Sequence, residues 1–298
     1  GGPLHLNLPM LPSSKAYRAC MKEDPNIFRP AIAEICRRLP QYGWTPAPVL
    51  VSEFPGSTPV FRLSSNALVK LFPPRYQEDY RSEHGLYALL QQHSVADQVR
   101  LPKMFSFAEF MDGENKWSYI AFEFLPGQPI VKIFEQISSS NRIAVAANLA
   151  TIVRAIHCLP VRNAALDSLS AETLLGYFRA NLPKLGISEG CRQDLQESLP
   201  SLEALLRGVL SEGRARVLHG DLGEGNLLLT QDGAGEWVIS GLIDMGDATI
   251  SCIEYEWVWL WFDLFKQDAG MMRSFMAVYD PSERMNAEWR RGCFWVTL

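Results

Sequence analysis

One short segment near residue 220 constrains the fold of this chain more than any other feature. Residues 217–229 read Val-Leu-His-Gly-Asp-Leu-Gly-Glu-Gly-Asn-Leu-Leu-Leu, so Asp221 and Asn226 lie five positions apart in a glycine-rich loop between two apolar runs. Gly223 and Gly225 let the backbone turn tightly between them. A carboxylate and an amide oxygen in such a loop suit phosphoryl transfer, which needs a base beside the attacking hydroxyl and oxygen ligands for Mg²⁺. The alternative is that both residues only decorate a β-turn.

A second acidic residue follows after one predicted β-hairpin. The runs 226–230 and 237–243 are strand-like, and the second run leads directly into Asp244. An apolar strand that ends in an Asp beside the first loop can bring a second ligand to the same metal ion, which argues against the β-turn alternative. We therefore predict that Asp221 is the catalytic base and that Asn226 and Asp244 are metal ligands.

A buried cation is expected upstream of this segment. Lys70 interrupts the otherwise apolar run Ala67–Phe72, and an ammonium group there costs free energy unless it has a partner. Glu83, on a helix predicted over 76–92, is a suitable partner. A strand Lys that is oriented by a helix Glu holds the α- and β-phosphates of the nucleotide in kinases. The alternatives are a Lys at a solvent-exposed strand edge and a Glu on an exposed helix face.

The order of predicted elements indicates an α+β chain of two lobes. The segment 125–129, Leu-Pro-Gly-Gln-Pro, breaks the pattern and is a natural hinge. We expect an N-terminal nucleotide-binding lobe at 1–125, with a helical lead-in to about residue 45, and a C-terminal catalytic and acceptor-binding lobe at 126–298. Strands are predicted at 49–51, 60–63, 67–72, 104–110, 118–124 and 216–218, and in the hairpin. Helices are predicted at 26–39 and 76–92, after the N-cap cluster 138–141, at 171–184 and 194–210, and from 254 onward.

Composition excludes several classes of partner. The formal net charge is -5, which favours neither nucleic acid nor an anionic membrane surface. The six cysteines are scattered, without a C-x-x-C pair or zinc-ligand spacing, as is typical of a reducing compartment. No run approaches the roughly 20 apolar residues that span a bilayer, and no signal peptide is visible. We expect a cytoplasmic protein that binds neither membranes nor nucleic acid, and nothing in the sequence indicates an oligomeric state.

These motifs resemble those of the aminoglycoside phosphotransferase family over about residues 27–265. The catalytic and metal-binding residues of the family fall on His219, Gly220, Asp221, Asn226 and Asp244. The resemblance implies the protein-kinase-like fold, with a small β-rich N-lobe and a larger, mainly helical C-lobe that contains the catalytic hairpin. It also implies ATP, with GTP possible, and Mg²⁺ as cofactors. Within the family, 46–72 and 244–265 are most similar to hygromycin B phosphotransferases.

The resemblance also assigns the nucleotide-binding residues. They are Lys70 and its partner Glu83, the hinge residues Glu123, Phe124 and Leu125, and the phosphate-covering amides of Ser57 and Thr58. The turn before Ser57 has one glycine, Gly56, where protein kinases use three. His157, at the end of a long C-lobe helix, is expected to pack and to form hydrogen bonds. His219 is expected to brace the catalytic loop.

The acceptor implied by the resemblance is small, polar and cationic. The candidates for contact with its ammonium groups are Asp247, Glu254, Glu256 and Asp263. For each of them, a solvated helix face or a helix-capping role is the alternative. Ser251-Cys252-Ile253 replaces the usual Gly-Asp-Pro of the family, which leaves Glu256 where the family often has an Asp. Tryptophans at 257, 259, 261, 289 and 295 are candidates for the wall of the acceptor cleft, although helical spacing favours the core for most of them.

The main functional hypothesis is an ATP-dependent O-phosphotransferase that acts on an aminoglycoside-like acceptor and confers antibiotic resistance. The first alternative is a metabolic kinase of the same fold that acts on choline, a sugar, an amino alcohol or a fructosamine, because one phosphate-transfer apparatus serves many acceptors. The second alternative is a nucleotide-binding pseudokinase module. It is disfavoured because Lys70, Asp221, Asn226 and Asp244 are all present.

Overall fold

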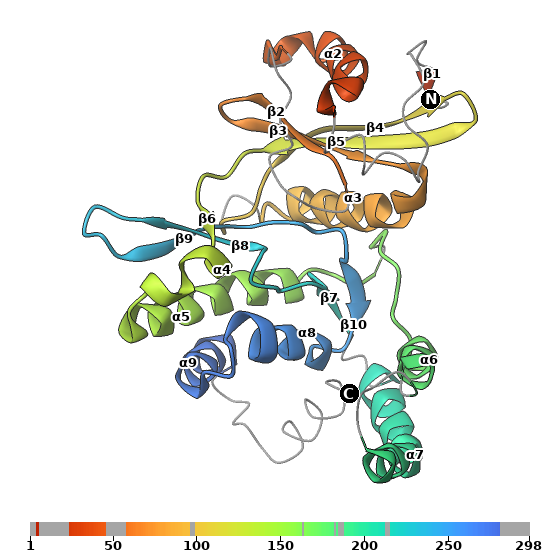
Figure 1. Cartoon of the computed structure of the whole chain (residues 1–298), viewed down its shortest axis with the longest axis vertical. Coiled ribbons are helices and arrows are strands. Elements are labelled where there is room, and N and C mark those ends of the chain that lie inside the picture. The colour runs from red at the N-terminus through yellow and green to blue at the C-terminus, as the bar shows by residue number, and fades with distance from the viewer. Residues whose placement is uncertain are drawn as a thin grey trace.

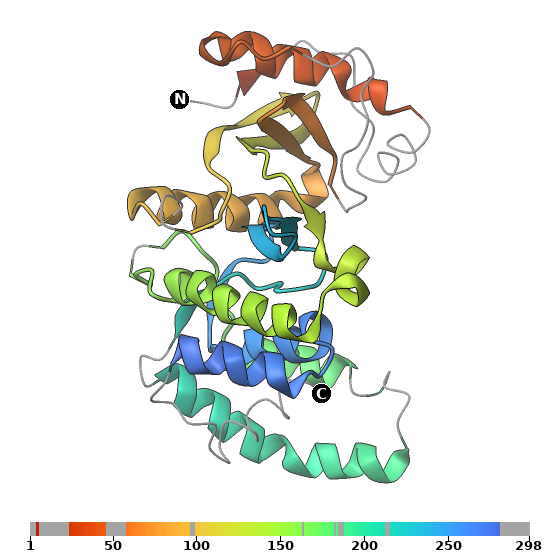
Figure 2. The same cartoon turned by 90° about the vertical axis from the view of Figure 1, so that its left-hand side faces the viewer.

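The computed structural model describes residues 4–5, 24–45, 58–95, 99–162, 164–181, 183, 188–211 and 215–280. These residues form a β-rich lobe and a mainly helical lobe that follow one another along the long axis of the molecule (Figures 1 and 2). This is the α+β arrangement expected from the sequence. The division at residue 125 remains our prediction of where the lobes separate. In the described part of the chain, none of the helices combines the length and the apolar character needed to cross a bilayer.

The N-terminal lobe is built on a five-stranded sheet with the order β1-β4-β5-β3-β2. The strands are β1 (Leu4–His5), β2 (Val60–Ser64), β3 (Ala67–Phe72), β4 (Met104–Asp112) and β5 (Asn115–Glu123). Helix α2 (Arg29–Arg38) covers one face of the sheet, and α3 (Gln77–Gln92) covers the other (Figure 1). Because the sheet is covered on both faces, all six residues of β3 are buried.

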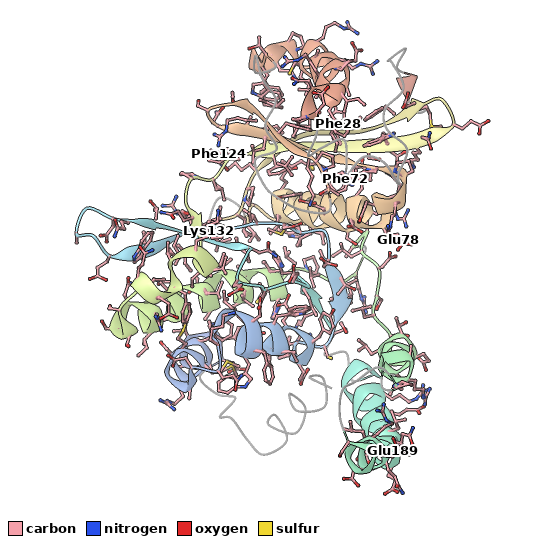
Figure 3. The ribbon with its side chains drawn as sticks, in the orientation of Figure 1. Phe28, Phe72, Glu78, Phe124, Lys132 and Glu189 are labelled. Atoms are coloured by element: carbon pink, nitrogen blue, oxygen red, sulfur yellow. The ribbon has the colours of Figure 1, made fainter. Side chains whose placement is uncertain are left out.

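The alternation of side chains along β3 decides where Lys70 points. Val69 and Leu71 belong to the core beneath α2, together with Phe28, whereas Phe72 belongs to the core beneath α3. Figure 3 labels Phe28 and Phe72 on these opposite faces of the sheet. Since alternate residues of a strand face opposite sides, Lys70 faces the same side as Phe72, toward α3.

The C-terminal lobe surrounds two small sheets. The first has the order β6-β8-β9 and the second pairs β7 with β10. Their strands are β6 (Gln128–Pro129), β7 (Arg216–Leu218), β8 (Leu227–Gln231), β9 (Trp237–Leu242) and β10 (Thr249–Ser251). The helices are α4 (Ile130–Ile133), α5 (Ser139–His157), α6 (Ala171–Asn181), α7 (Glu189–Ser211), α8 (Glu254–Val258), a π-helix over Trp259–Leu264, and α9 (Ala269–Tyr279). Helices α5 and α9 lie side by side in both views (Figures 1 and 2).

Helix α5 anchors the hairpin that leads to Asp244. Its N-cap is Ser138, whose hydroxyl accepts a hydrogen bond from the backbone N–H of Asn141 at 3.2 Å. The side chain of Asn141 then binds the backbone of Trp237 at the start of β9, through one accepted bond of 2.8 Å and one donated bond of 2.9 Å. The catalytic hairpin is therefore tied to the longest well-buried helix of this lobe.

Most of the predicted elements are confirmed, and the differences concern their bounds and their helix type. The helix predicted at 26–39 is a 3-10 turn (Pro25–Phe28) followed by α2, and the helix from 254 changes to a π-helix at Trp259. Helix α7 begins at Glu189, five residues before the predicted start. Strands β1, β6 and β10 and helices α4 and α9 were not predicted. The strand predicted at 49–51 lies outside the described residues, as does Ser57.

Candidate active site

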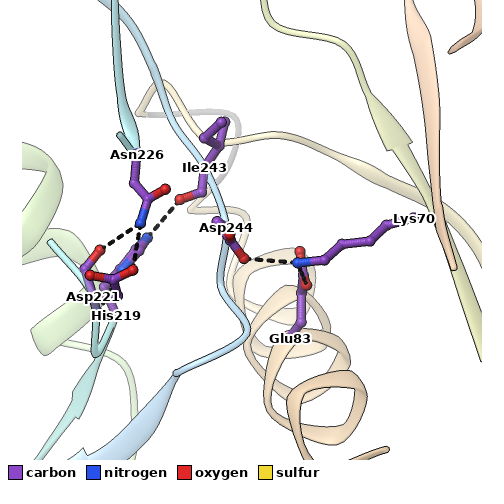
Figure 4. A network of polar contacts seen from close by, with 7 residues as sticks. All are labelled: Lys70, Glu83, His219, Asp221, Asn226, Ile243 and Asp244. Carbon is purple, nitrogen blue, oxygen red and sulfur yellow. Dashed lines mark hydrogen bonds and ion pairs between the residues drawn. The ribbon is translucent and has the colours of Figure 1, made fainter. Parts of the chain in front are cut away.

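Lys70 joins three elements in one ion network. Its Nζ lies 2.7 Å from Oε2 of Glu83 on α3 and 2.8 Å from Oδ1 of Asp244 in the loop after β9 (Figure 4). The side chains of Lys70 and Glu83 are 8% and 1% exposed. The predicted pairing of Lys70 with Glu83 is thus present in the structure. The contact with Asp244 also joins the N-terminal lobe to the C-terminal lobe.

The charges in this network shift one another's pKa values. Burial opposes the charge on Lys70, but Asp244 and Glu83 outweigh it and raise the pKa of Lys70. The Lys70 charge holds the pKa of Asp244 below its usual value. Burial raises the pKa of Glu83 to about 7, because Lys70 offsets only part of the cost of burying this carboxylate and Asp244 repels it. One lysine therefore serves two carboxylates, and Glu83 is the less fully compensated of the two.

The catalytic loop holds Asp221 and Asn226 against each other. Nδ2 of Asn226 donates to the backbone oxygen of Asp221 at 3.0 Å and to Oδ2 of its carboxylate at 2.9 Å. With its nitrogen on Asp221, the Asn226 amide presents its oxygen on the opposite side, as Figure 4 shows. The backbone N–H of Ile243 donates to the backbone oxygen of Asn226 at 2.9 Å, which fixes the loop beside the residue that precedes Asp244. Burial raises the pKa of Asp221.

His219 braces this loop, as predicted. It is completely buried. Its Nε2 lies 3.1 Å from the backbone oxygen of Ile243, and its Nδ1 accepts a hydrogen bond from the backbone N–H of Asp221 at 3.3 Å. These two contacts hold the ring between the catalytic loop and the end of β9. His219 therefore sets the spacing between the predicted base and the predicted metal ligand Asp244.

Two backbone positions near the site have positive φ angles. Gly220 has φ +87, and a Cβ atom there would lie 1.9 Å from the backbone oxygen of Asp247. Only a glycine permits this approach of the two loops. Asp244 has φ +63, a region that non-glycine residues enter uncommonly and Asp more readily than most. The loop after β9 is therefore bent sharply at the residue that contacts Lys70.

A buried chain of hydrogen bonds supports the catalytic loop from the helical side. Oε1 of Glu256 accepts from the backbone N–H of Gly220 at 2.8 Å, and Oε2 lies 2.7 Å from Nε2 of His157. Nδ1 of His157 lies 2.7 Å from the hydroxyl of Tyr279. Glu256 is completely buried and both of its carboxylate oxygens are engaged. This placement does not favour the predicted contact of Glu256 with an acceptor and indicates a supporting role.

Asp263 lies beside the same loop, on the side of the predicted base. Its Oδ2 accepts from the backbone N–H of Glu224 at 2.9 Å. A Cβ atom at Gly223 would lie 3.0 Å from this oxygen and 3.1 Å from Oδ1 of Asp221, so the two carboxylates flank one glycine. Asp263 also lines a shallow pocket of about 290 Å³, together with Val258, Trp259 and Phe262.

The other two acidic candidates lie at the edge of this region. Asp247 is exposed, and burial of part of its carboxyl group together with the Asp244 charge raises its pKa. Glu254 is half-buried at the start of α8. Of the four acidic residues predicted to meet an acceptor, Asp263 bonds to the loop of Asp221 with a side chain that is 36% exposed, whereas Glu256 bonds to this loop from a completely buried position.

The predicted hinge residues contact both lobes. The Glu123 carboxylate accepts from the backbone N–H of Lys103 at 3.3 Å, and the N–H of Phe124 donates to the oxygen of Asn66 at 2.9 Å. Leu125 packs against Gly241, where a Cβ atom would lie 2.4 Å from its Cδ1. Figure 3 labels Phe124 where the chain leaves β5. Thr58 is buried just before β2, and the predicted contact of Ser57 with phosphate lies outside the described residues.

The donor set fits a divalent cation that arrives with phosphates. Mg²⁺ is commonly held by one or two protein carboxylates or amides, with phosphate oxygens and water as its other ligands. Asn226 and Asp244 supply such a pair from two adjoining loops. Within the described residues, no group of three or more His, Cys, Asp or Glu side chains could hold a metal by itself. The arrangement therefore suits Mg²⁺ and not a closed zinc site.

Two supporting residues could not be recognised from the sequence motifs. Tyr279 lies on α9, a helix that its apolar spacing at Met271, Phe275 and Tyr279 would have indicated. Asn141 was assigned only to an N-cap cluster, and no pattern in the sequence signals that its amide binds Trp237.

The sequence matches a known family, and the fold is similar to those of solved structures. A model of the phosphotransferase enzyme family matches residues 52–295. No curated protein sequence gives a significant match. Among solved structures, the chain is similar to the GDP complex of wild-type aminoglycoside 2'-phosphotransferase-IIIa, with a TM-score of 0.66 and 18% identity over 88% of this chain and 85% of that one.

Two further structures show the same similarity. The streptomycin–ATP–APH(2")-IIa ternary complex has a TM-score of 0.61 and 16% identity, over 88% of this chain and 87% of that one. APH(3'')-Id from Streptomyces rimosus, in complex with ADP and streptomycin, has a TM-score of 0.54 and 17% identity, over 89% of this chain and 98% of that one. At such identities the structures establish the fold, so the predicted protein-kinase-like fold is confirmed.

The family assignment rests on the family model, which covers most of the chain, and it agrees with the fold of the structural neighbours. The narrower resemblance to hygromycin B phosphotransferases stays a prediction. The chain belongs to the phosphotransferase enzyme family, within the protein-kinase-like fold of the aminoglycoside phosphotransferases.

Proposed function

We propose that the protein transfers the γ-phosphoryl group of ATP or GTP to a hydroxyl group of a small, amine-bearing acceptor of the aminoglycoside type. The observation that carries this proposal is the single network formed by Lys70, Glu83 and Asp244 beside the Asp221–Asn226 pair. These are the parts that phosphoryl transfer requires: a cation for the phosphates, ligands for a metal, and a base.

Each residue has a role in the proposed reaction. Lys70 binds phosphate oxygens, and Glu83 holds it in place. Mg²⁺ bound by Asn226 and Asp244 would supply positive charge to the β- and γ-phosphate oxygens. Asp221 orients the acceptor hydroxyl and takes its proton. The hydroxyl oxygen forms a bond to the γ-phosphorus as the bond from that phosphorus to the bridging oxygen breaks, and the nucleoside diphosphate leaves with the bond electrons.

The acceptor side of the proposal rests on the pocket beside Asp263. Its carboxylate attracts an ammonium group, and the exposed rings of Trp259 and Phe262, which are 37% and 43% exposed, offer faces for a cation or an apolar edge. Asp247 and Glu254 are further candidates for the amino groups of a polycationic acceptor. The structural neighbours named above include complexes with streptomycin, which agrees with this class of acceptor.

The same pocket also favours a second candidate function. Three apolar residues and one carboxylate, as in Val258, Trp259, Phe262 and Asp263, suit an acceptor with one charged nitrogen as well as they suit a polycation. A metabolic kinase for choline or an amino alcohol therefore remains the alternative. Antibiotic resistance follows only from the first candidate.

One screen tests the proposal and separates the candidates. The protein is incubated with ATP or GTP and Mg²⁺ against aminoglycosides, choline and amino alcohols, and mass spectrometry detects the gain of one phosphoryl group. Aminoglycoside products together with reduced susceptibility of an expressing host would support the first candidate, and choline or amino-alcohol products alone would support the second. Nucleotide binding without transfer to any acceptor would contradict both and favour a binding module.

Asp221→Asn provides the matched control for this screen. The substitution keeps the size of the side chain and removes the charge that takes the proton. We expect kcat to fall about 10²–10⁴-fold, the usual range for loss of a general base. The Kd for ATP·Mg²⁺ should change little, because Lys70, Asn226 and Asp244 carry that binding. Turnover at the wild-type rate would show that Asp221 is not the base.

A further inference from the structure

Tyr87 on α3 carries a buried hydroxyl group with no assigned role. The residue is 1% exposed, and its oxygen has no hydrogen-bond partner among the described residues. Buried polar groups are nearly always paired, because an unpaired donor keeps the cost of leaving water without a compensating bond. A phenol that only filled the core would be better replaced by the ring of Phe. The unpaired hydroxyl therefore points to a partner that is engaged elsewhere in this state.

The position of Tyr87 points to Glu83 as that partner. Tyr87 follows Glu83 by four residues on α3, so the two side chains lie on one face of the helix, one turn apart. Its ring stacks on Phe122 of β5, with centroids 6.1 Å apart, and β5 leads directly into the nucleotide hinge. Burial, and then the charges of Glu83 and Asp244, raise the pKa of Tyr87, so the hydroxyl keeps its proton and can act only toward these carboxylates as a donor.

Glu83 is well supplied with donors in the structure described above. Its carboxylate receives Lys70 at 2.7 Å and a backbone hydrogen bond from Met245, the residue after Asp244. Asp244 shares the same Lys70 ammonium at 2.8 Å. In the proposed reaction Lys70 binds phosphates and Asp244 binds a metal ion. The two donors to Glu83, the Lys70 ammonium and the backbone N–H of Met245, are then weakened or moved. A fully buried carboxylate then needs a replacement donor.

We propose that Tyr87 is a positioning residue of the nucleotide site, whose hydroxyl donates a hydrogen bond to the Glu83 carboxylate when nucleotide and metal are bound. The bond keeps Glu83 oriented toward Lys70 after Asp244 has left the network. This inference rests on the proposed function, because it requires that the chain binds a nucleotide. The Tyr87 hydroxyl is unpaired in the free form of the ion network and bonded to Glu83 in the nucleotide-bound form.

The test is Tyr87→Phe, which keeps the ring and its stacking on Phe122 and removes only the hydroxyl. The free protein should unfold at the same or a slightly higher temperature, because an unpaired donor has been removed from the core. The Kd for ATP·Mg²⁺, measured by calorimetry, should rise about 10-fold, the loss that corresponds to one hydrogen bond to a charged group. The increase in Tm on nucleotide addition should shrink accordingly.

Tyr80→Phe is the matched control on the same helix. Tyr80 is also buried, but its ring contacts Phe72 and His84, and the charge that acts on its hydroxyl is Glu109 on β4. Its loss should leave the Kd for nucleotide unchanged. In a Glu83→Ala background the effect of Tyr87→Phe on the Kd should largely disappear, because the acceptor of the proposed hydrogen bond is gone.

Two results would overturn the inference. An unchanged Kd for Tyr87→Phe would show that the hydroxyl takes no part in the loaded site. A large loss of stability in the free protein, with no change in Kd, would show that the hydroxyl is already paired through water and serves the fold. If the wild-type chain itself fails to bind nucleotide, the proposed function fails first, and this outcome is distinct from either of the other two.

Discussion

Replacing Glu256 with Ala tests whether the helical lobe holds the catalytic loop in place. The substitution leaves two buried groups without their acceptor, the backbone N–H of Gly220 and Nε2 of His157. Each buried donor left unpaired costs about 1–3 kcal/mol, and the substitution adds two such costs. We expect Glu256→Ala to lower the free energy of unfolding by about 2–6 kcal/mol, which is a large share of the usual 5–15 kcal/mol.

Glu256→Gln separates the shape of the side chain from its charge. The amide oxygen can still accept from Gly220, so the loss should be only about 1–2 kcal/mol. Urea denaturation gives both values, and kcat should fall with Ala more than with Gln because Gly220 precedes Asp221. Glu135→Ala is the surface control, since Glu135 is 93% exposed in its pair with Arg142 and should contribute less than about 1 kcal/mol. If Glu256→Ala lowers the free energy of unfolding no more than this control does, Glu256 does not support the catalytic loop.

The same pair of proteins gives a pH dependence with a defined sign. Burial alone would raise the pKa of Glu256, but His157, His219 and the Gly220 N–H together outweigh it and lower the pKa below 4.5. A carboxyl group with a lowered pKa in the folded state stabilises the fold above its unfolded pKa and loses this effect as the pH falls through the folded value. The stability difference between wild type and Glu256→Gln should therefore be full at neutral pH and shrink below about pH 4.5. A difference that stays constant down to pH 3 would contradict the assignment.

Three further predictions follow from the site. Lys70→Ala should lower kcat/KM by several orders of magnitude and Glu83→Gln by less, and the double variant should be little worse than Lys70→Ala, so additive losses in steady-state kinetics would mean that the two do not act as a unit. Gly220→Ala should lower the unfolding free energy by roughly 2–4 kcal/mol in urea denaturation, since a Cβ atom there meets backbone, whereas Gly225→Ala, with open space around it, should change it by less than about 0.5 kcal/mol. Asp244→Ala should abolish transfer in the phosphorylation assay, as should excess chelator with the wild-type protein; full activity in chelator would refute the metal ligands.

The catalytic motifs could be recognised from the sequence because their geometry is local. Asp221 and Asn226 are linked by one tight loop, and Asp244 follows after one hairpin, so chain connectivity alone brings them together. The partnership of Lys70 with Glu83 was also predictable, since a charge in an apolar strand needs a partner and the next helix offers one. The bond between Lys70 and Asp244 was not, because it joins residues 174 positions apart and depends on how the two lobes pack.

Glu256 shows the opposite case, in which the sequence did not predict that the side chain is buried. Its place in the sequence, after the metal-binding Asp and among other acids, made it a candidate for the acceptor. Whether a residue near the start of a helix is exposed depends on what packs over it, and here His157 from α5 and Tyr279 beyond it enclose the side chain. Tyr279 lies on α9, a helix that was not predicted, so the burial of Glu256 was not predicted either.

The bond between Lys70 and Asp244 has a consequence for how the free enzyme waits between turnovers. Lys70, which is predicted to bind phosphates, already contacts the Asp244 carboxylate at 2.8 Å. Under the proposed function, Asp244 is an intramolecular competitor of the nucleotide phosphates, because both are anions that bind the same Lys70 ammonium. In the empty state Asp244 adds a second anion to the buried Lys70–Glu83 pair, and under the proposed function the phosphates must displace it, which lowers their affinity. Phosphates that displaced Asp244 would at the same time break this ion pair between the two lobes.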